Sequence, residues 1–134
     1  MKNFKADIYN IERKNRFNVE IGVSNGWSVT YSSKNGKGRA LLFDNNSTLK
    51  SFRKLHQMKD DEMYLFGIET TPSNAGVGKM FLKDIFDYFD INLLYLPSDD
   101  NHPVWNKIAT KTNIESFNDD LTIFTIDREQ LFGE

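Results

Sequence analysis

The expected fold depends mainly on residues 63–96, MYLFGIETTPSNAGVGKMFLKDIFDYFDINLLYL. This stretch begins with the nearly continuous apolar run 63–68 and ends with the apolar run 93–96, a composition typical of strands that are buried on both faces. Between these runs, four apolar residues recur at helical spacing: Val77, Phe81, Ile85 and Phe89. Two neighbouring strands that are joined through a helix are expected to be parallel, with a right-handed crossover.

An alternating pattern predicts antiparallel strands before this stretch. Apolar and polar residues alternate over 17–23 and again over 27–32, which is the period of a half-buried strand. Asn25-Gly26 and Asn35-Gly36 follow these runs. Asn-Gly favours a hairpin because both residues accept positive φ. We therefore expect a three-stranded antiparallel meander over residues 17–43.

The remaining segments receive weaker predictions. Residues 3–11 are expected to add a strand, and Asn46 or Ser47 to cap a helix. Residues 114–127 are expected to return to strand, and Pro103 fits the first turn of a short helix. The chain is thus predicted to be a single α/β domain spanning residues 1–134, with a mixed sheet in which the meander precedes a βαβαβ unit. The predicted core unites Phe66, Phe81, Ile85, Leu94 and Phe124.

Composition excludes several classes of function. The 134 residues carry a net charge of −2, which argues against general nucleic-acid binding. The absence of cysteine excludes thiolate zinc sites and cysteine nucleophiles. His56 and His102 are far apart in the sequence, so we expect no metal site. No apolar run is long enough to span a membrane, and the first residues lack the apolar core of a secretory signal, so we expect a soluble cytoplasmic protein.

The segment IETTPSNAGVG, residues 68–78, lies between an expected strand and an expected helix and predicts an anion site. The first N–H groups of a helix lack internal partners, and the helix dipole adds positive charge there. Gly76 and Gly78 would let a phosphate approach the backbone, and Lys79 can add a charge. The alternative is a plain strand-to-helix turn whose glycines allow close packing.

These residues resemble the GNAT family of N-acetyltransferases, whose pyrophosphate loop is Arg/Gln-x-x-Gly-x-Gly/Ala. Residues 73–78, SNAGVG, match both glycines, and Asn101 matches an Asn that often follows the next strand. The resemblance covers roughly residues 62–127 and implies acetyl-CoA as co-substrate, an amine as acceptor and a parallel strand pair that splays at its carboxyl ends. It implies cofactor contacts at Ile68, Thr70, Ser73, Asn74, Ala75, Gly76, Val77, Gly78, Lys79 and Asn101.

The sequence departs from the family in features that concern cofactor contact, catalysis and the acceptor site. Ser73 replaces the usual Arg or Gln, and Ile108 stands where the family has a general-acid Tyr. Hairpins also replace the helices that the family has between its first two strands. The candidate bases are Glu62, which holds the position of a catalytic Glu in some family members, and Glu69, which is closer to the loop. Backbone N–H groups of 67–69 can stabilise the thioester oxygen.

Three functions follow as hypotheses. The first is transfer of an acetyl group from acetyl-CoA to a primary amine of a small molecule or protein. The second is a non-enzymatic GNAT-like protein that acts by binding a protein partner, or another copy of itself. The third, a small nucleic-acid-binding β domain, conflicts with the acidic net charge. Asp99 and Asp100 follow the second buried strand and can attract a cationic acceptor or simply form a turn.

Overall fold

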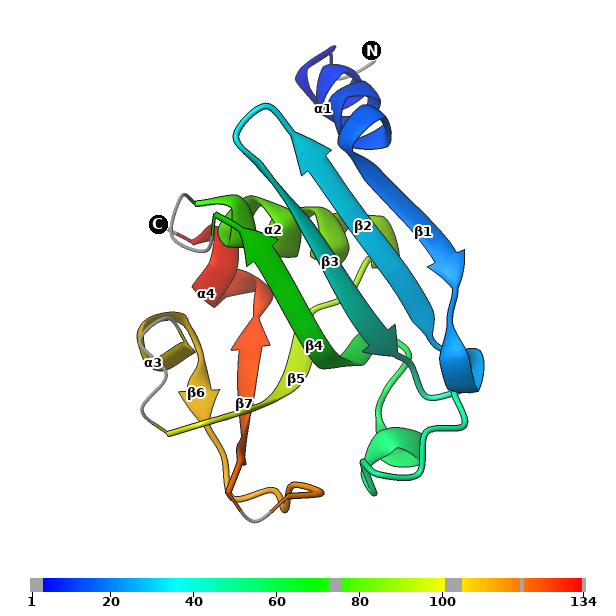
Figure 1. Ribbon diagram of the computed structural model, residues 1–134, viewed down its shortest axis with the longest axis vertical. Helices are drawn as coiled ribbons and strands as arrows, with labels where there is room; N and C mark the ends of the chain where they lie inside the picture. Colours follow the sequence, from blue (N-terminus) through cyan, green and yellow to red (C-terminus); the bar gives the residue numbers. More distant parts are fainter. Residues whose placement is uncertain (1–3, 73–75, 101–104, 119, 134) are drawn as a thin grey trace.

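Figure 1 shows the computed structural model of the chain, which describes residues 4–72, 76–100, 105–118 and 120–133. In this part of the chain seven strands form one sheet, in the order β1-β2-β3-β4-β5-β7-β6. The strands are β1 (Phe17–Ile21), β2 (Trp27–Ser33), β3 (Gly36–Phe43), β4 (Glu62–Thr71), β5 (Leu93–Ser98), β6 (Thr110–Lys111) and β7 (Thr122–Asp127). The helices are α1 (Phe4–Arg16), α2 (Val77–Phe89), α3 (Trp105–Ile108) and α4 (Arg128–Phe132), with the short 3₁₀ turns η1 (Val23–Asn25) and η2 (Leu55–Gln57).

The meander predicted over residues 17–43 is confirmed. β1 pairs antiparallel with β2, and β2 with β3. Ser24 and Asn25 adopt left-handed φ angles of 54° and 56° between β1 and β2. Ser33 pairs directly with Gly36, so two residues close the second hairpin.

The parallel pair is also confirmed, and it is short. β4 pairs with β5 only from Glu62↔Leu93 to Tyr64↔Tyr95, although both strands continue further. Beyond this point β4 stays with β3 as far as Thr71, and β5 stays with β7 as far as Ser98. The two strands therefore diverge toward their carboxyl ends because each follows a different antiparallel partner.

The sheet carries an apolar cluster on each face. One cluster packs beneath α2 and contains four of the five predicted core residues, namely Phe81, Ile85, Leu94 and Phe124, all at most 2% exposed. The prediction for Phe66 is wrong, because this side chain is 39% exposed. Met63 and Leu65 pack in the α2 cluster, so Phe66 points to the opposite face, where its ring contacts Phe43 and Tyr64.

Three predicted segments differ from the structure. Residues 4–16 form α1 instead of a strand, and hydrogen bonds from Tyr9 and Arg16 to the buried Asp84 hold this helix on α2. The helix expected directly after Ser47 is absent from residues 48–54. The Ser47 hydroxyl instead donates to the carbonyl of Asn25, in the connection between β1 and β2. Strand structure in the last predicted strand begins only at Thr122, and the segment before it forms a loop.

The segment between β3 and β4 keeps the apolar pattern without the helix. Phe52 and Leu55 are buried in the second cluster, and Leu49 packs against it. The spacing of these residues therefore predicted the buried side chains correctly but not the element that presents them.

Candidate functional site

The divergence of β4 and β5 leaves an opening of about 210 Å³ between them. Its walls belong to the parts of the two strands that do not pair with each other: Leu65, Phe66, Gly67 and Ile68 on β4, and Leu96, Pro97 and Ser98 on β5. These walls combine apolar side chains with polar groups, so an extended chain that carries both can fit.

A β-bulge in β4 lies at this opening. Leu42 of β3 pairs with Leu65, whereas Leu41 pairs with Gly67, so Phe66 is an extra residue. A bulge bends its strand and changes the direction of nearby backbone groups. A Cβ built at Gly67 meets no described atom within 4 Å, so the backbone can be approached closely at this position.

The carboxyl end of β4 leads to the amino end of α2. Gly76 precedes the helix with a left-handed φ of 76°, which favours glycine. The Met80 N–H donates to the Gly76 carbonyl at 3.3 Å at the start of the helix. Val77 is 3% exposed and fixes the start of the helix in the core. The backbone N–H groups of the first turn point away from the helix, as in other helices.

Both glycines of the predicted loop leave room beside the backbone. A Cβ built at Gly76 meets no described atom within 4 Å, and at Gly78 it meets only the Thr70 methyl group, at 3.9 Å. The structure thus brings Thr70, Gly76 and Gly78 together, with Lys79 in the first turn of α2 and Ile68 in the wall of the strand opening. The predicted contacts at Ser73, Asn74, Ala75 and Asn101 lie outside the described residues.

The two candidate bases lie on β4, on either side of the bulge. The Glu62 carboxylate accepts a hydrogen bond from the Lys59 backbone N–H at 3.0 Å. The Glu69 carboxylate pairs with Arg39 on β3 at 2.8 Å, and both side chains are at least 70% exposed. Neither glutamate is among the described residues that line the strand opening.

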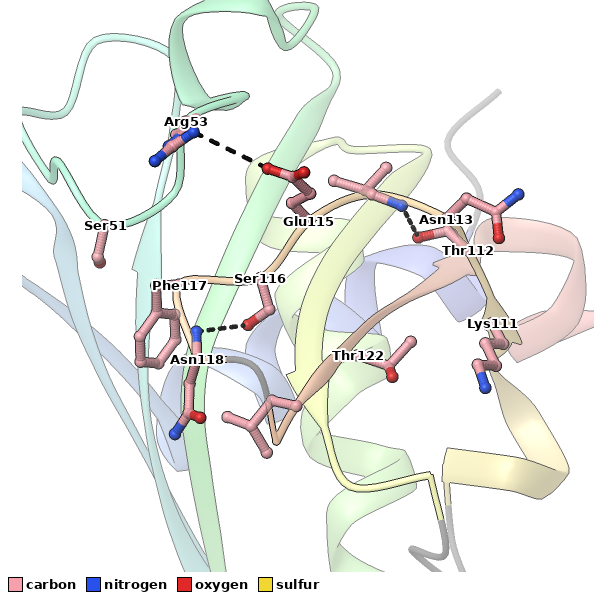
Figure 2. Close-up of a pocket in the computed structure, with 12 residues that line it drawn as sticks. Ser51, Arg53, Lys111, Thr112, Asn113, Glu115, Ser116, Phe117, Asn118 and Thr122 are labelled. Carbon is pink, nitrogen blue, oxygen red and sulfur yellow. Dashed lines mark hydrogen bonds and ion pairs between the residues drawn. The ribbon is translucent and has the colours of Figure 1, made fainter.

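A larger cleft, which the sequence did not predict, lies beside the strand opening (Figure 2). It measures about 500 Å³ and is formed by two segments that are far apart in the sequence. Its lining residues are Ser51 and Arg53 after β3, together with residues 111–118, 121 and 122 between β6 and β7. The sequence did not predict this cleft because its lining segments were expected to form a helix after Ser47 and a strand from residue 114.

Side-chain-to-backbone hydrogen bonds shape the loop on one side of the cleft. The Ile114 N–H donates to the Thr112 hydroxyl, the Asn118 N–H to the Ser116 hydroxyl and the Asp120 N–H to the Asn118 side-chain oxygen Oδ1. Such turns replace strand pairing with local bonds. The recurrence of Thr, Ser and Asn at these positions was the sequence signal for a structured loop.

The strand opening and the cleft share a wall. The Phe66 ring, which lines the opening, stacks on the Phe117 ring, which lines the cleft, with ring centroids 5.8 Å apart. Ser98 of the opening pairs directly with Thr122 of the cleft. A molecule in the cleft and a chain in the opening would therefore be neighbours.

Two exposed ion pairs flank the cleft. Arg53 lies 3.8 Å from Glu115, and Lys111 lies 3.0 Å from Asp100. Hydrogen bonds from Thr122 and Lys111 hold the pKa of the Asp100 carboxyl below its ordinary value, so this carboxylate stays charged at neutral pH. Of the two acidic residues expected after β5, Asp100 is thus bound to β6.

The position of the family's general acid is occupied by an apolar side chain. Ile108 packs against the core cluster beneath α2. Elsewhere the buried hydroxyl groups of Ser51 and Tyr64 have no hydrogen-bond partner among the described residues. Burial raises the pKa of the Tyr64 phenol above its usual range, so it keeps its proton.

The residues that the structure describes meet neither the requirements for a metal site nor those for a membrane-spanning helix. No three His, Asp or Glu side chains in them gather closely enough to hold a metal ion. No helix within them is both long and apolar enough to cross a bilayer.

Comparisons with known proteins give distant structural likeness only. No protein-family model matches the chain, and no curated protein matches its sequence. Among solved structures, the crystal structure of the N-acetyltransferase PseH from Campylobacter jejuni in complex with acetyl coenzyme A is similar, with a TM-score of 0.46 and 12% sequence identity. The similarity covers 93% of this chain and 79% of that chain. Likeness of this degree carries no argument about function, which is taken below from the residues of this chain.

Proposed function

We propose that the chain is a GNAT-type N-acetyltransferase that binds acetyl-CoA between β4 and β5. The observation that carries this proposal is the divergence of two parallel strands directly before a helix whose amino end is open beside Gly76 and Gly78. The opening and the helix end lie on one continuous segment, so a single extended ligand can occupy both.

The pyrophosphate would bind at the amino end of α2. Backbone N–H groups at Val77 and Gly78 can donate to it, and the helix dipole favours its charge. Lys79 adds a positive side chain in the same turn, and Ser73, Asn74 and Ala75 complete the loop. Because Ser73 replaces an Arg or Gln of the family motif, most of the contacts would come from the backbone.

The pantetheine chain and the thioester would occupy the opening. Beyond Tyr64 the edge of β4 that faces β5 has no β5 partner for its backbone groups. N–H groups of residues 67–69 can therefore donate to the thioester oxygen as negative charge develops on it. Ile68 would lie against the chain, and Asn101 would contact the cofactor beyond β5.

The reaction joins the amine nitrogen of the acceptor to the acetyl carbonyl carbon and breaks the bond between that carbon and sulfur. The amine gives up a proton to Glu62 or Glu69, each acting through water because neither lines the opening. The departing CoA thiolate takes up a proton. Since a thiol has a pKa of about 8.5, the thiolate is a tolerable leaving group, so losing the acid that Ile108 replaces slows this step without preventing it.

The test is acetyl-CoA turnover with a panel of amines, comparing the wild type with Glu62→Gln and Glu69→Gln. Loss of the base should lower kcat by roughly 10²–10⁴-fold in one of these variants. Glu20→Gln, on the exposed face of β1, is the matched control and should keep full activity. Full activity in both variants would show that the base lies elsewhere.

The replacement of the family acid by the core residue Ile108 also favours a second candidate, a non-enzymatic protein of the same fold that acts through a protein partner. Acetyl-CoA binding without acetylation of any acceptor would support this second candidate over the first.

A further inference from the structure

The cleft beside the strand opening presents one positive and one negative side chain that are held together loosely. Arg53 and Glu115 are 90% and 86% exposed and lie 3.8 Å apart (Figure 2). An exposed ion pair of this kind contributes little to stability, so a ligand can separate its members at small cost. Lys111, the third charged residue of the lining, is already paired with Asp100.

Both charged residues are positioned by the residues that precede them. Phe52, before Arg53, is 2% exposed, and its ring stacks on Tyr64 with centroids 4.1 Å apart. Ile114, before Glu115, packs against the same apolar cluster. The backbone therefore holds both residues at the cleft while their side chains stay in solvent.

The cleft also offers an aromatic face. Phe117 is 46% exposed, and its ring is fixed by stacking on Phe66. An apolar side chain can pack on this ring beside the strand opening.

We propose that the acceptor is an amino acid with a free amine, a free carboxylate and an apolar side chain. Its carboxylate would bind the Arg53 guanidinium, whose fork matches a carboxylate, and its ammonium would bind Glu115. Its side chain would lie on Phe117, next to the strand opening. This inference rests on the proposed function, in which the bound amine attacks the thioester of acetyl-CoA, releasing CoA and leaving an N-acetyl amino acid.

The charge balance of the cleft favours this class over other acceptors. A simple amine would engage Glu115 alone. An anion without an amine would engage Arg53 alone. A ligand that carries both charges satisfies both residues at once.

The test is an NMR titration of the isotope-labelled full chain, with and without CoA. The ligands are L-phenylalanine, L-phenylalaninamide and 2-phenylethylamine, which share a ring and an amine, whereas only the first carries a carboxylate. L-phenylalanine should perturb the backbone signals of Ser51, Arg53 and Glu115 and bind at least about tenfold more tightly than the other two.

Variants locate the two contacts. Arg53→Gln should weaken L-phenylalanine binding about tenfold and leave L-phenylalaninamide unchanged, whereas Glu115→Gln should weaken both. Lys14→Gln, an exposed residue of α1, removes one positive charge away from the cleft and should change neither.

Equal binding of the three ligands, or no effect of Arg53→Gln, would overturn this inference and leave the proposed function standing. Binding of L-phenylalanine in the cleft without binding of acetyl-CoA would support the amino-acid site and contradict the proposed acetyltransferase function.

Discussion

Phe81 is the residue on which the core beneath α2 depends most. It is fully buried, and its ring contacts those of Phe17 and Tyr31. Gly38 of β3 allows this packing, because a Cβ there would lie 2.7 Å from the Phe81 ring. We expect Phe81→Ala to lower the free energy of unfolding by about 3–5 kcal/mol, measured by urea denaturation.

Phe66 provides the contrast on the opposite face of the sheet. Its ring is partly exposed and contacts the rings of Phe43, Tyr64 and Phe117. Because the side chain is only partly buried, we expect Phe66→Ala to cost about 1–2 kcal/mol in the same measurement, less than Phe81→Ala. A loss as large as that of Phe81→Ala would mean that Phe66 belongs to the core after all.

At the scale of elements, a buried ion pair holds α1 on α2. Asp84 is 0% exposed and accepts hydrogen bonds from Arg16 at 2.8 and 2.9 Å and from Tyr9 at 2.5 Å. Arg16→Met would leave this carboxylate buried without a cation. We expect a loss of about 3–5 kcal/mol in the free energy of unfolding.

The matched double variant Arg16→Met with Asp84→Leu removes both charges and should recover much of this loss. If Arg16→Met alone is as stable as the wild type, the pair does not hold α1 in place.

The sequence predicted those elements whose pattern is set locally. Alternation over residues 17–32 gave β1 and β2, and the two apolar runs around a helical repeat gave β4, α2 and β5. α1 escaped prediction because its anchor, Asp84, lies 68 residues beyond Arg16 in the chain. The segment after Ser47 has helical spacing, but the Ser47 hydroxyl donates to the Asn25 carbonyl, 22 residues earlier, and Phe52 and Leu55 are buried in the second cluster without a regular helix.

In the candidate site, too, the sequence predicted the local features and missed those that depend on contacts between distant segments. The loop at Gly76 and Gly78 was predictable because strand, glycines and helix are consecutive in the sequence. The cleft was not, since Arg53 and Glu115 come together only through the packing of Phe52 and Ile114. The three turns of the loop between β6 and β7 are local, yet no pattern showed that they face residues 51–53.

At the scale of the whole molecule, the sheet consists of two halves that diverge. In the described residues, the half β1-β2-β3-β4 pairs with the half β5-β7-β6 through the short parallel register at the start of β4 and β5. Figure 1 shows β4 and β5 diverging, with α2 following β4 along the chain. The strand opening lies between these two strands, and the cleft is lined by Ser51, Arg53 and residues from β6 to the start of β7. In the proposed function, this arrangement would place acetyl-CoA and the acceptor next to each other on one sheet.

The most direct test of acetyl-CoA binding is isothermal titration calorimetry with the wild type, Gly78→Ala and Gly78→Asp. An aspartate in the first turn of α2 should stabilise the helix by about 0.3–1 kcal/mol, yet it places negative charge where the pyrophosphate would lie. We predict that the wild type binds one acetyl-CoA per chain, that Gly78→Ala keeps most of this affinity and that Gly78→Asp, although folded, binds at least about tenfold more weakly. No binding to the wild type, or equal binding to Gly78→Asp, would contradict the account.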